Sequence, residues 1–536
     1  MKFLIKLAKN RKPTKGHDLC NQDDMLIEMN IKDKKETPIY FKVFRNPKVL
    51  KKSVDKRNAY FKRMGKSFKV QLKNFIDKEI SPNIITIQQL QVNTIQSIIQ
   101  SIKSELEKRK NEKHNYSSNK TTSFTKAEKK LEYWENEIKL DDSIINLSIE
   151  NKSIPKQIIN NKNNIIFLTG TTGFLGVYLL YQLLLLPTCT KVYCLIRNKS
   201  NNDNPIIEIY DNMKKHLLYN KLNTHQLSKI NVIVGDLSKN QFGLNNKEYK
   251  LLANDINLII NSGADINLLA DYESIKPVNV NGVKEIIKLS LSSSKIIVPI
   301  VNLSTYSVFM KQEPKGDFKD NFDEQQFGLV PLENLNILPG GYMQSKVIGE
   351  YILSSAAKLK SIPYIIIRSP SIFSNPTTGI GHNADFAQLF IQACSIIGHY
   401  PDLSIGFLAS PITWCVENFT NVILNENSWS TNNNSPISKL NVYNINSEVI
   451  ISETLVKDFS KRIDFSQWKK LINQSENKTC IKLRTFHTLN YGRFDISNGY
   501  GISYRTKQLL ISLGSYGNGS IINYEMIYNL LNYNKK

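Results

Sequence analysis

The segment TGTTGFLG, residues 169–176, limits the possible folds of this chain more than any other part of the sequence. It follows the apolar run IIFL and precedes VYLLYQLLLL, so its glycines lie between an expected buried strand and an expected helix. In that context Gly170 makes the tight turn, Gly173 lets the backbone approach a pyrophosphate, and Gly176 allows close helix–strand packing. The first N–H groups of the helix are free to bind phosphate. The segment therefore predicts a dinucleotide-binding turn.

Strand and helix patterns alternate after residue 164, which predicts an α/β fold with a doubly wound parallel sheet of the Rossmann type. The further strand candidates are KVYCLIR, INVIVGD, INLIINSG, KIIVPIVNLST and PYIIIRSP. At 536 residues the chain is too long for one simple core. We divide it into a basic N-terminal segment (1–60), a small helical unit (61–108), a linker and docking helix (109–160), a Rossmann domain (161–375) and a C-terminal region expected to bind the substrate (376–536).

The segment from Ile165 to Leu186 carries no charge and is long enough to cross a membrane, but its interior TGTTG fits a strand, a turn and a helix better. The N-terminal residues MKFLIKLAKNRK lack an apolar stretch of signal-peptide length, and the six cysteines have no metal-ligand or disulfide spacing. We therefore expect a cytoplasmic protein without a transmembrane segment or a metal site. Residues 1–150 carry +13 of the formal net charge of +23, but no nucleic-acid-binding module accompanies them, so we expect no nucleic-acid partner.

The type of dinucleotide depends on the residue at the end of the second strand. An acidic residue there binds a ribose 2′-hydroxyl, whereas an arginine accommodates a 2′-phosphate. The strand CLIR ends in Arg197, 21 residues after Gly176, which favours NADP(H) over NAD(H); the alternative is a solvated arginine. Asp236 and Leu237, in VGDL, are expected at the adenine edge, although an aspartate at a strand end is often only a helix cap.

The segment GGYMQSK places Tyr342 four residues before Lys346, so that both side chains share one helix face. Both residue types are common, and the spacing alone favours an ordinary polar helix face. The segments TGTTGFLG, CLIR, VGDL, NSGADIN, KPVNVNG, NLST and GGYMQSK nevertheless follow one another as in the extended short-chain dehydrogenase/reductases. More narrowly, the chain from about Tyr133 to Phe373 resembles the thioester reductase domains that end certain polyketide and non-ribosomal peptide synthetases. Fatty acyl-CoA reductases are close relatives.

This resemblance implies that hydride from NADPH reduces an acyl thioester to an aldehyde, and in some cases onward to an alcohol. Tyr342 would act as the acid, Lys346 would lower the pKa of the phenol, and Thr305 would hydrogen-bond the carbonyl oxygen. Ser304, one position earlier, is the alternative to Thr305. One departure is Asn261, where relatives often carry histidine. The implied cofactor contacts are Gly170, Thr172, Gly173, Phe174, Leu175, Gly176, Arg197, Asp236, Leu237, Lys346 and Arg368.

Three further residues have an equal or stronger structural interpretation. Arg368 and Pro370, in IIIRSP, resemble the strand beneath the nicotinamide, but a structural role is as well supported. Asn279, in PVNVNG, is expected to serve architecture rather than chemistry. The loop TGIGHNADF, with Thr378, Gly379, Asn383 and Asp385, resembles the family's connection into the substrate region.

The segment VQLKNFIDKEISPNIITIQQLQVNTIQSII resembles the second half of an acyl carrier domain. Such domains carry phosphopantetheine on the serine of an Asp-Ser-Leu motif. Counting back from Val70 places that serine at Lys66, whereas Ser67 lies one position late and lacks the aspartate. We expect a degenerate carrier, so that the acyl chain would arrive from a carrier on another protein, such as a polyketide synthase. The alternatives are that Ser67 is still modified, that the chain is a fatty acyl-CoA reductase, or that it is a non-catalytic relic.

Overall fold

A computed structural model describes two parts of the chain that form separate compact units, Met1–Thr121 and Thr122–Lys536. The acyl-carrier-like unit (61–108), including Ser67, and most of the expected linker lie outside the described residues. The described residues are 5–6, 24–32, 38–45, 126–155, 157–159, 162–197, 204–268, 270–309, 328–338, 340–383, 385–402, 409–429, 441–445, 460–487, 510, 512–513 and 524–533.

The first unit contains an antiparallel sheet in the order β1-β2-β3. Its strands are β1 (Ile5–Lys6), β2 (Asp24–Lys32) and β3 (Pro38–Arg45). The sequence analysis predicted no regular element in this basic segment.

The second unit is built on a seven-stranded sheet in the order β13-β9-β8-β7-β4-β5-β6, in which every neighbouring pair is parallel. The predicted Rossmann-type fold is confirmed. Only β13 was not predicted, because its three residues lie in an Asn-rich polar stretch. The strands are β4 (Asn164–Thr169), β5 (Cys189–Ile196), β6 (Ile230–Val234), β7 (Leu258–Asn261), β8 (Ile300–Thr305), β9 (Tyr364–Ser369) and β13 (Val442–Asn444).

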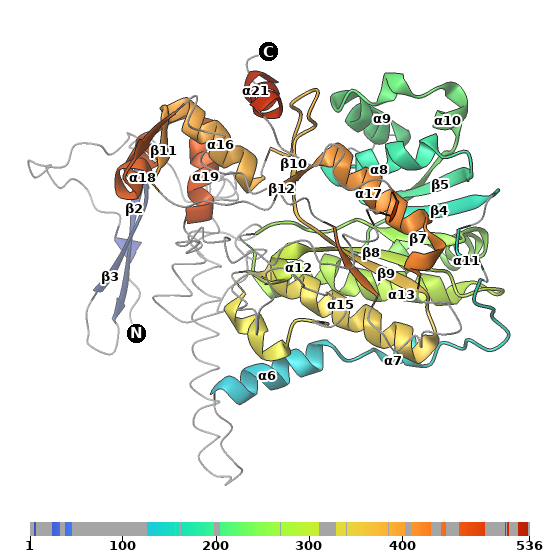
Figure 1. Cartoon of the computed structure of the whole chain (residues 1–536). Coiled ribbons are helices and arrows are strands. Elements are labelled where there is room, and N and C mark those ends of the chain that lie inside the picture. The colour runs from blue at the N-terminus through green and yellow to red at the C-terminus, as the bar shows by residue number, and fades with distance from the viewer. Residues whose placement is uncertain are drawn as a thin grey trace, which may run out of the picture. The chain divides into compact units, whose positions relative to one another are not determined.

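Apolar side chains leave both faces of this sheet, which explains why the strands read as continuous apolar runs. Phe167 of β4 packs into the core under one helical layer, and its neighbour Leu168 packs into the core under the other. Figure 1 shows the two layers on opposite sides of the sheet. One layer contains α11 (Asn246–Asp255), α12 (Tyr272–Asn279), α13 (Asn281–Ser292) and α15 (Gly341–Lys360). The other contains α8 (Phe174–Leu185), α9 (Ile206–Lys215), α10 (Thr224–Ser228) and α17 (Ile412–Leu424).

The strand order reverses between β4 and β7, because the chain builds outward from β4 first to one side and then to the other. Ligands of open parallel sheets bind outside the carboxyl ends of the strands at such a reversal. The turn after β4, residues 170–173, lies at this point. The segment predicted to bind the dinucleotide is therefore where the fold places a ligand.

The expected docking helix is α6 (Lys126–Glu137), followed by the short α7 (Asp142–Ile145). Trp134 donates a hydrogen bond of 3.1 Å to Asn336 in the 3-10 helix η4 (Leu332–Ile337). Glu137 accepts hydrogen bonds from the Tyr272 hydroxyl at 2.5 Å and from Lys276 at 2.6 Å. The helix is thus fixed to α12 and to the segment that precedes α15.

A third apolar cluster, around Phe390 and Trp468, forms the core of the C-terminal region. No helix in the described ranges is long and apolar enough to cross a membrane. The elements here are α16 (Phe386–Ile397), α18 (Phe465–Gln474), α19 (Lys478–His487), α21 (Tyr524–Tyr533), and two parallel strand pairs, β10 (Ser371–Phe373) with β12 (Ala409–Pro411) and β11 (His399–Pro401) with β14 (Lys461–Ile463).

Candidate active site

The glycine turn after β4 is packed too closely for larger residues. Gly170 has a φ of +82°, and a Cβ atom on it would lie 2.9 Å from Gly263. A Cβ atom on Gly176 would lie 2.1 Å from the main-chain oxygen of Gly170, so only glycine lets α8 approach the strand end this closely. Gly173 caps α8, and Thr172 beside it is exposed while Phe174 and Leu175 are half-buried. The turn has the shape predicted for it.

Two sets of amide side chains hold this turn, and the sequence analysis assigned neither. Asn212 on α9 donates to the main-chain oxygens of Thr171 at 3.2 Å and Gly173 at 3.3 Å. Asn261 accepts a hydrogen bond from the Thr169 hydroxyl and donates one to Asn302, each at 2.8 Å. The second set joins the carboxyl ends of β4 and β7 to the middle of β8. NSGADIN begins with Asn261 and NLST begins with Asn302, but neither motif predicts these hydrogen bonds, because the side chains meet only when the sheet forms.

Arg197 and Asp236 follow β5 and β6 at the same end of the sheet. Arg197 is exposed. Burial opposes the charge of Asp236, but hydrogen bonds from the Ser238 N–H and hydroxyl, at 2.9 and 2.8 Å, and the positive charge of Arg197 hold its pKa below the usual value. Leu237 is buried against Gly282. The carboxylate of Asp236 is thus ionised and closes a local turn with Ser238. It does not cap a helix, because the next helix begins after Lys239 and has no side-chain cap.

Thr305, Tyr342 and Lys346 come together at the carboxyl end of β8. Tyr342 is in the first turn of α15 and Lys346 one turn later, as the spacing predicts. Lys346 Nζ donates to the main-chain oxygen of Leu303 at 2.7 Å and lies 6.0 Å from the centroid of the Tyr342 ring. The Thr305 side chain is hydrogen-bonded to the phenol.

The pKa of Tyr342 differs from the expectation. Burial raises it to about 12, and the hydrogen bond with Thr305 only partly opposes this shift. Burial lowers the pKa of Lys346 to about 8, and the charge of Glu350 opposes that change. The expected lowering of the phenol pKa by Lys346 is absent because the ammonium is bonded to Leu303 rather than to the phenol. At neutral pH Tyr342 is therefore a neutral hydrogen-bond donor.

Ser304 and Thr305 face opposite sides of β8, as successive strand residues do. The Ser304 hydroxyl donates to Glu350 at 2.5 Å in the interior, away from Tyr342, which favours Thr305 as the partner of the phenol. Arg368 has no exposed surface and pairs with Glu350 at 2.6 Å. Any contact of Arg368 with a cofactor would have to come from its main chain, so its side chain has the structural role.

The paired glycines of GGYMQSK allow α15 to begin against α12. A Cβ atom on Gly341 would lie 2.3 Å from the main chain of Asp271. Asn279 holds the loop after β7, because its amide accepts from Asp265 N at 2.8 Å and donates to Asp265 O at 2.9 Å. The same amide donates to Ser345 at 3.0 Å. Asn279 therefore has the architectural role that was expected.

The loop TGIGHNADF is mostly held by structural contacts. Asp385 caps α16 and accepts from the Ser371 hydroxyl at 2.6 Å, and Gly379, with a φ of +71°, packs against Asn529 of α21. The loop also reaches the start of α8, because the His382 ring lies 6.3 Å from the ring of Phe174.

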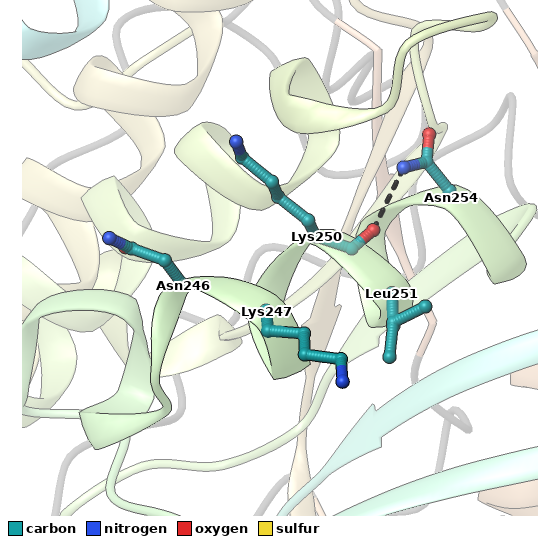
Figure 2. A pocket seen from close by; sticks show the side chains of 5 residues that line it. All are labelled: Asn246, Lys247, Lys250, Leu251 and Asn254. Atoms are coloured by element: carbon teal, nitrogen blue, oxygen red, sulfur yellow. Dashed lines mark hydrogen bonds between the residues drawn. The ribbon is translucent and has the colours of Figure 1, made fainter.

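A hollow on the exposed side of α11 lies away from these residues (Figure 2). All of its lining side chains belong to that one helix, and none of the predicted site residues borders it. We assign it no role. The lining residues are Asn246, Lys247, Lys250, Leu251 and Asn254.

The parallel seven-stranded sheet with a glycine turn at its reversal point is the Rossmann-type fold that the resemblance to the extended short-chain dehydrogenase/reductases implied. Residues 168–419 match the family model described as "Male sterility protein". Residues 66–118 match the model described as "Highly reducing polyketide synthase sdgA, C-terminal ACP domain".

Curated relatives from Dictyostelium discoideum include "Probable polyketide synthase 9/36" and "Probable polyketide synthase 6", each 46% identical to this chain. The alignments cover 86% and 85% of this chain but only 16% and 15% of those proteins, so the chain spans a small part of their length.

Among solved structures, the terminal reductase domain of the myxalamid pathway superposes with a TM-score of 0.59 at 23% identity, covering 75% of this chain and 96% of that one. A thiolation-reductase di-domain from an archaeal non-ribosomal peptide synthetase gives 0.56 at 20%, covering 88% and 91%.

These comparisons confirm the resemblance to a polyketide synthase thioester reductase domain preceded by an acyl-carrier-like segment. They support an oxidoreductase with a nicotinamide cofactor. The structural matches, each below 25% identity, establish the fold.

Proposed function

We propose that this chain reduces a carrier- or CoA-bound acyl thioester to an aldehyde with NADPH, as in the reductive release of a polyketide. The observation that carries this proposal is the convergence of Thr305, Tyr342 and Lys346 beside the glycine turn. The three groups are at the carboxyl edge of the sheet, the same edge at which the glycine turn follows β4, which supports a carbonyl bound beside a cofactor there.

Each site residue has a separate role in the proposed reaction. NADPH, when bound, supplies the hydride to the thioester carbonyl carbon. Tyr342 and Thr305 donate hydrogen bonds to the carbonyl oxygen as it becomes negative, a charge that neutral donors in a buried site stabilise well. The C–S bond then breaks as the carbonyl re-forms, and the thiolate takes up a proton to leave as a thiol. Lys346, bonded to the end of β8, holds this edge of the site and would contact the nicotinamide ribose.

The glycine turn supports dinucleotide binding. Glycine at 170 and 176 lets α8 begin directly against the strand end, and the first N–H groups of such a helix can bind phosphate. Exposed Arg197 supports NADPH, since its guanidinium is available for a 2′-phosphate. The negative charge of Asp236 offsets part of the positive charge of Arg197. We therefore expect NADPH to bind more tightly than NADH without excluding NADH.

The carrier-like match at residues 66–118 and the polyketide synthase relatives support a carrier-bound substrate. The missing Asp-Ser-Leu motif around Ser67 supports delivery from a carrier on another protein. A fatty acyl-CoA reductase would instead prefer CoA esters.

The test is NADPH oxidation by the purified chain against a panel of acyl-pantetheine, acyl-CoA and acyl-carrier thioesters, with mass-spectrometric identification of the product. An aldehyde formed in proportion to NADPH consumed would support the proposal, and an alcohol would reveal a second reduction. Binding of NADPH without turnover of any thioester would favour a non-catalytic relic.

A further inference from the structure

Glu350 lies on α15 one turn after Lys346, and its side chain has no exposed surface. Its carboxylate accepts hydrogen bonds from Arg368 Nε at 3.0 Å and Nη2 at 2.6 Å, and from the Ser304 hydroxyl at 2.5 Å. One buried carboxylate therefore ties α15 to the carboxyl ends of β8 and β9.

The same end of β8 carries the groups assigned to the reaction. Ser304 lies between Leu303, whose oxygen accepts the hydrogen bond from Lys346, and Thr305. We propose that Glu350 is a positioning residue, which holds the end of β8 against α15 so that Thr305 and Lys346 stay aligned with Tyr342. This inference rests on the proposed function and adds to it the residue that keeps the reacting groups in place.

Stability alone is a poor explanation for this ion pair. Burying two charges costs desolvation free energy that their attraction often fails to recover, and apolar side chains of similar volume frequently do as well. The pair instead selects one arrangement of three elements. That arrangement brings the Thr305 hydroxyl and the Lys346 ammonium to the same strand end.

The charge of Glu350 also acts on Lys346, since it opposes the burial that lowers the pKa of Lys346 to about 8. In the described part of the chain, Lys346 has Tyr342 and Glu350 as neighbours on its own helix, and its ammonium is bonded to the Leu303 carbonyl of β8. Arg368 on β9 is the cation paired with Glu350. Loss of the carboxylate charge should therefore lower the pKa of Lys346 further. A contact that served packing alone would not have this effect.

The experiment measures the pH at which Lys346 becomes reactive, by brief acetic anhydride labelling of the full chain across a pH series and peptide mass spectrometry. In Glu350→Gln the midpoint should fall by about one pH unit, and turnover of a thioester that the wild type reduces should fall with it. Glu350→Asp keeps the charge but is too short to span both partners. Its midpoint should stay near that of the wild type while its turnover falls.

The matched control is Glu137→Gln. Glu137 also accepts from one cation, Lys276, and one hydroxyl, that of Tyr272, but it lies on α6. This variant should keep the wild-type midpoint and turnover. A wild-type midpoint in Glu350→Gln would overturn the proposal.

If Glu350→Gln does not fold, Ser304→Ala carries the test, because it breaks the link to β8 without leaving a charge unpaired. Turnover equal to that of the wild type in Ser304→Ala would then overturn the proposal. The labelling needs no substrate, so its outcome stands apart from the proposed function. A wild type that binds NADPH but reduces no thioester would refute that function, while the midpoint would still decide the role of Glu350.

Discussion

The ammonium of Lys346 is bonded to the main-chain oxygen of Leu303 at 2.7 Å, not to the phenol of Tyr342 one helical turn away. The lysine therefore fixes the helix to the end of β8. The phenol, whose pKa burial raises to about 12, stays protonated at neutral pH.

Tyr342→Phe should lower thioester turnover by at least about tenfold, because it removes the hydrogen-bond donor to the carbonyl oxygen. The measurement is the initial rate of NADPH oxidation with saturating thioester. Tyr351→Phe is the control, since Tyr351 is on the same helix but donates to the main-chain oxygen of Val330. Equal rates in wild type and Tyr342→Phe would refute the assigned donor.

Activity should fall as the pH rises through about 8, because Lys346 loses its proton there. The free energy of unfolding, in contrast, should increase as the pH rises above about 8. The folded pKa lies below the ordinary value of 10.5, so between these two values the unfolded chain binds more protons, and stability from this group rises with pH. Urea unfolding on both sides of pH 8 measures the slope. Lys346→Met should flatten it, and an unchanged slope would contradict the assignment.

Arg197→Ser should weaken NADPH binding by about tenfold and leave NADH binding nearly unchanged, because only NADPH carries the 2′-phosphate. Fluorescence titration with each cofactor measures the ratio. Lys247→Ser, on the exposed side of α11, removes an equal charge away from the site and should alter neither affinity. A proportional loss for both cofactors in Arg197→Ser would count against the 2′-phosphate contact.

Gly176→Ala should destabilise the folded unit by about 1–3 kcal/mol and abolish cofactor binding, because its Cβ atom would lie 2.1 Å from the oxygen of Gly170. Gly349→Ala on α15 is the matched control. Its Cβ atom would meet Val283 and Asn279 at ordinary distances of 3.5 and 3.6 Å. Chemical denaturation measures the loss of stability of both variants, and NADPH titration measures their cofactor affinity. Normal NADPH binding by Gly176→Ala would contradict the proposed cofactor site at the glycine turn.

Ser67 should remain unmodified after incubation with a phosphopantetheinyl transferase and CoA, because the aspartate of the attachment motif is missing. Intact-mass spectrometry checks this, with Ser67→Ala beside it to exclude attachment elsewhere. A mass increase that is lost in Ser67→Ala would overturn the degenerate interpretation and make delivery within one chain the simpler route.

The sequence predicted the sheet well because each buried strand is a short apolar run bounded by turns. It also placed Tyr342 and Lys346 on one helix face, since the helical period fixes that relation. It did not predict the partner of Lys346, because the oxygen of Leu303 belongs to a strand 43 residues away. The partners of Asn212, Asn302 and Glu350 were missed for the same reason. Even Asn302, which begins the motif NLST, acquires its role only through tertiary contacts.

The last strand of the sheet, β13, comes from Val442–Asn444, well after β9 in the chain. During synthesis on the ribosome, β9 therefore emerges with its outer edge unpaired. That edge stays unpaired until the residues up to and including β13 have been translated. An open strand edge is a template for pairing with other chains. A gene fragment ending before Asn444 would make this exposure permanent, so the boundary at which the reductase can be excised lies beyond the segment that its sequence motifs mark.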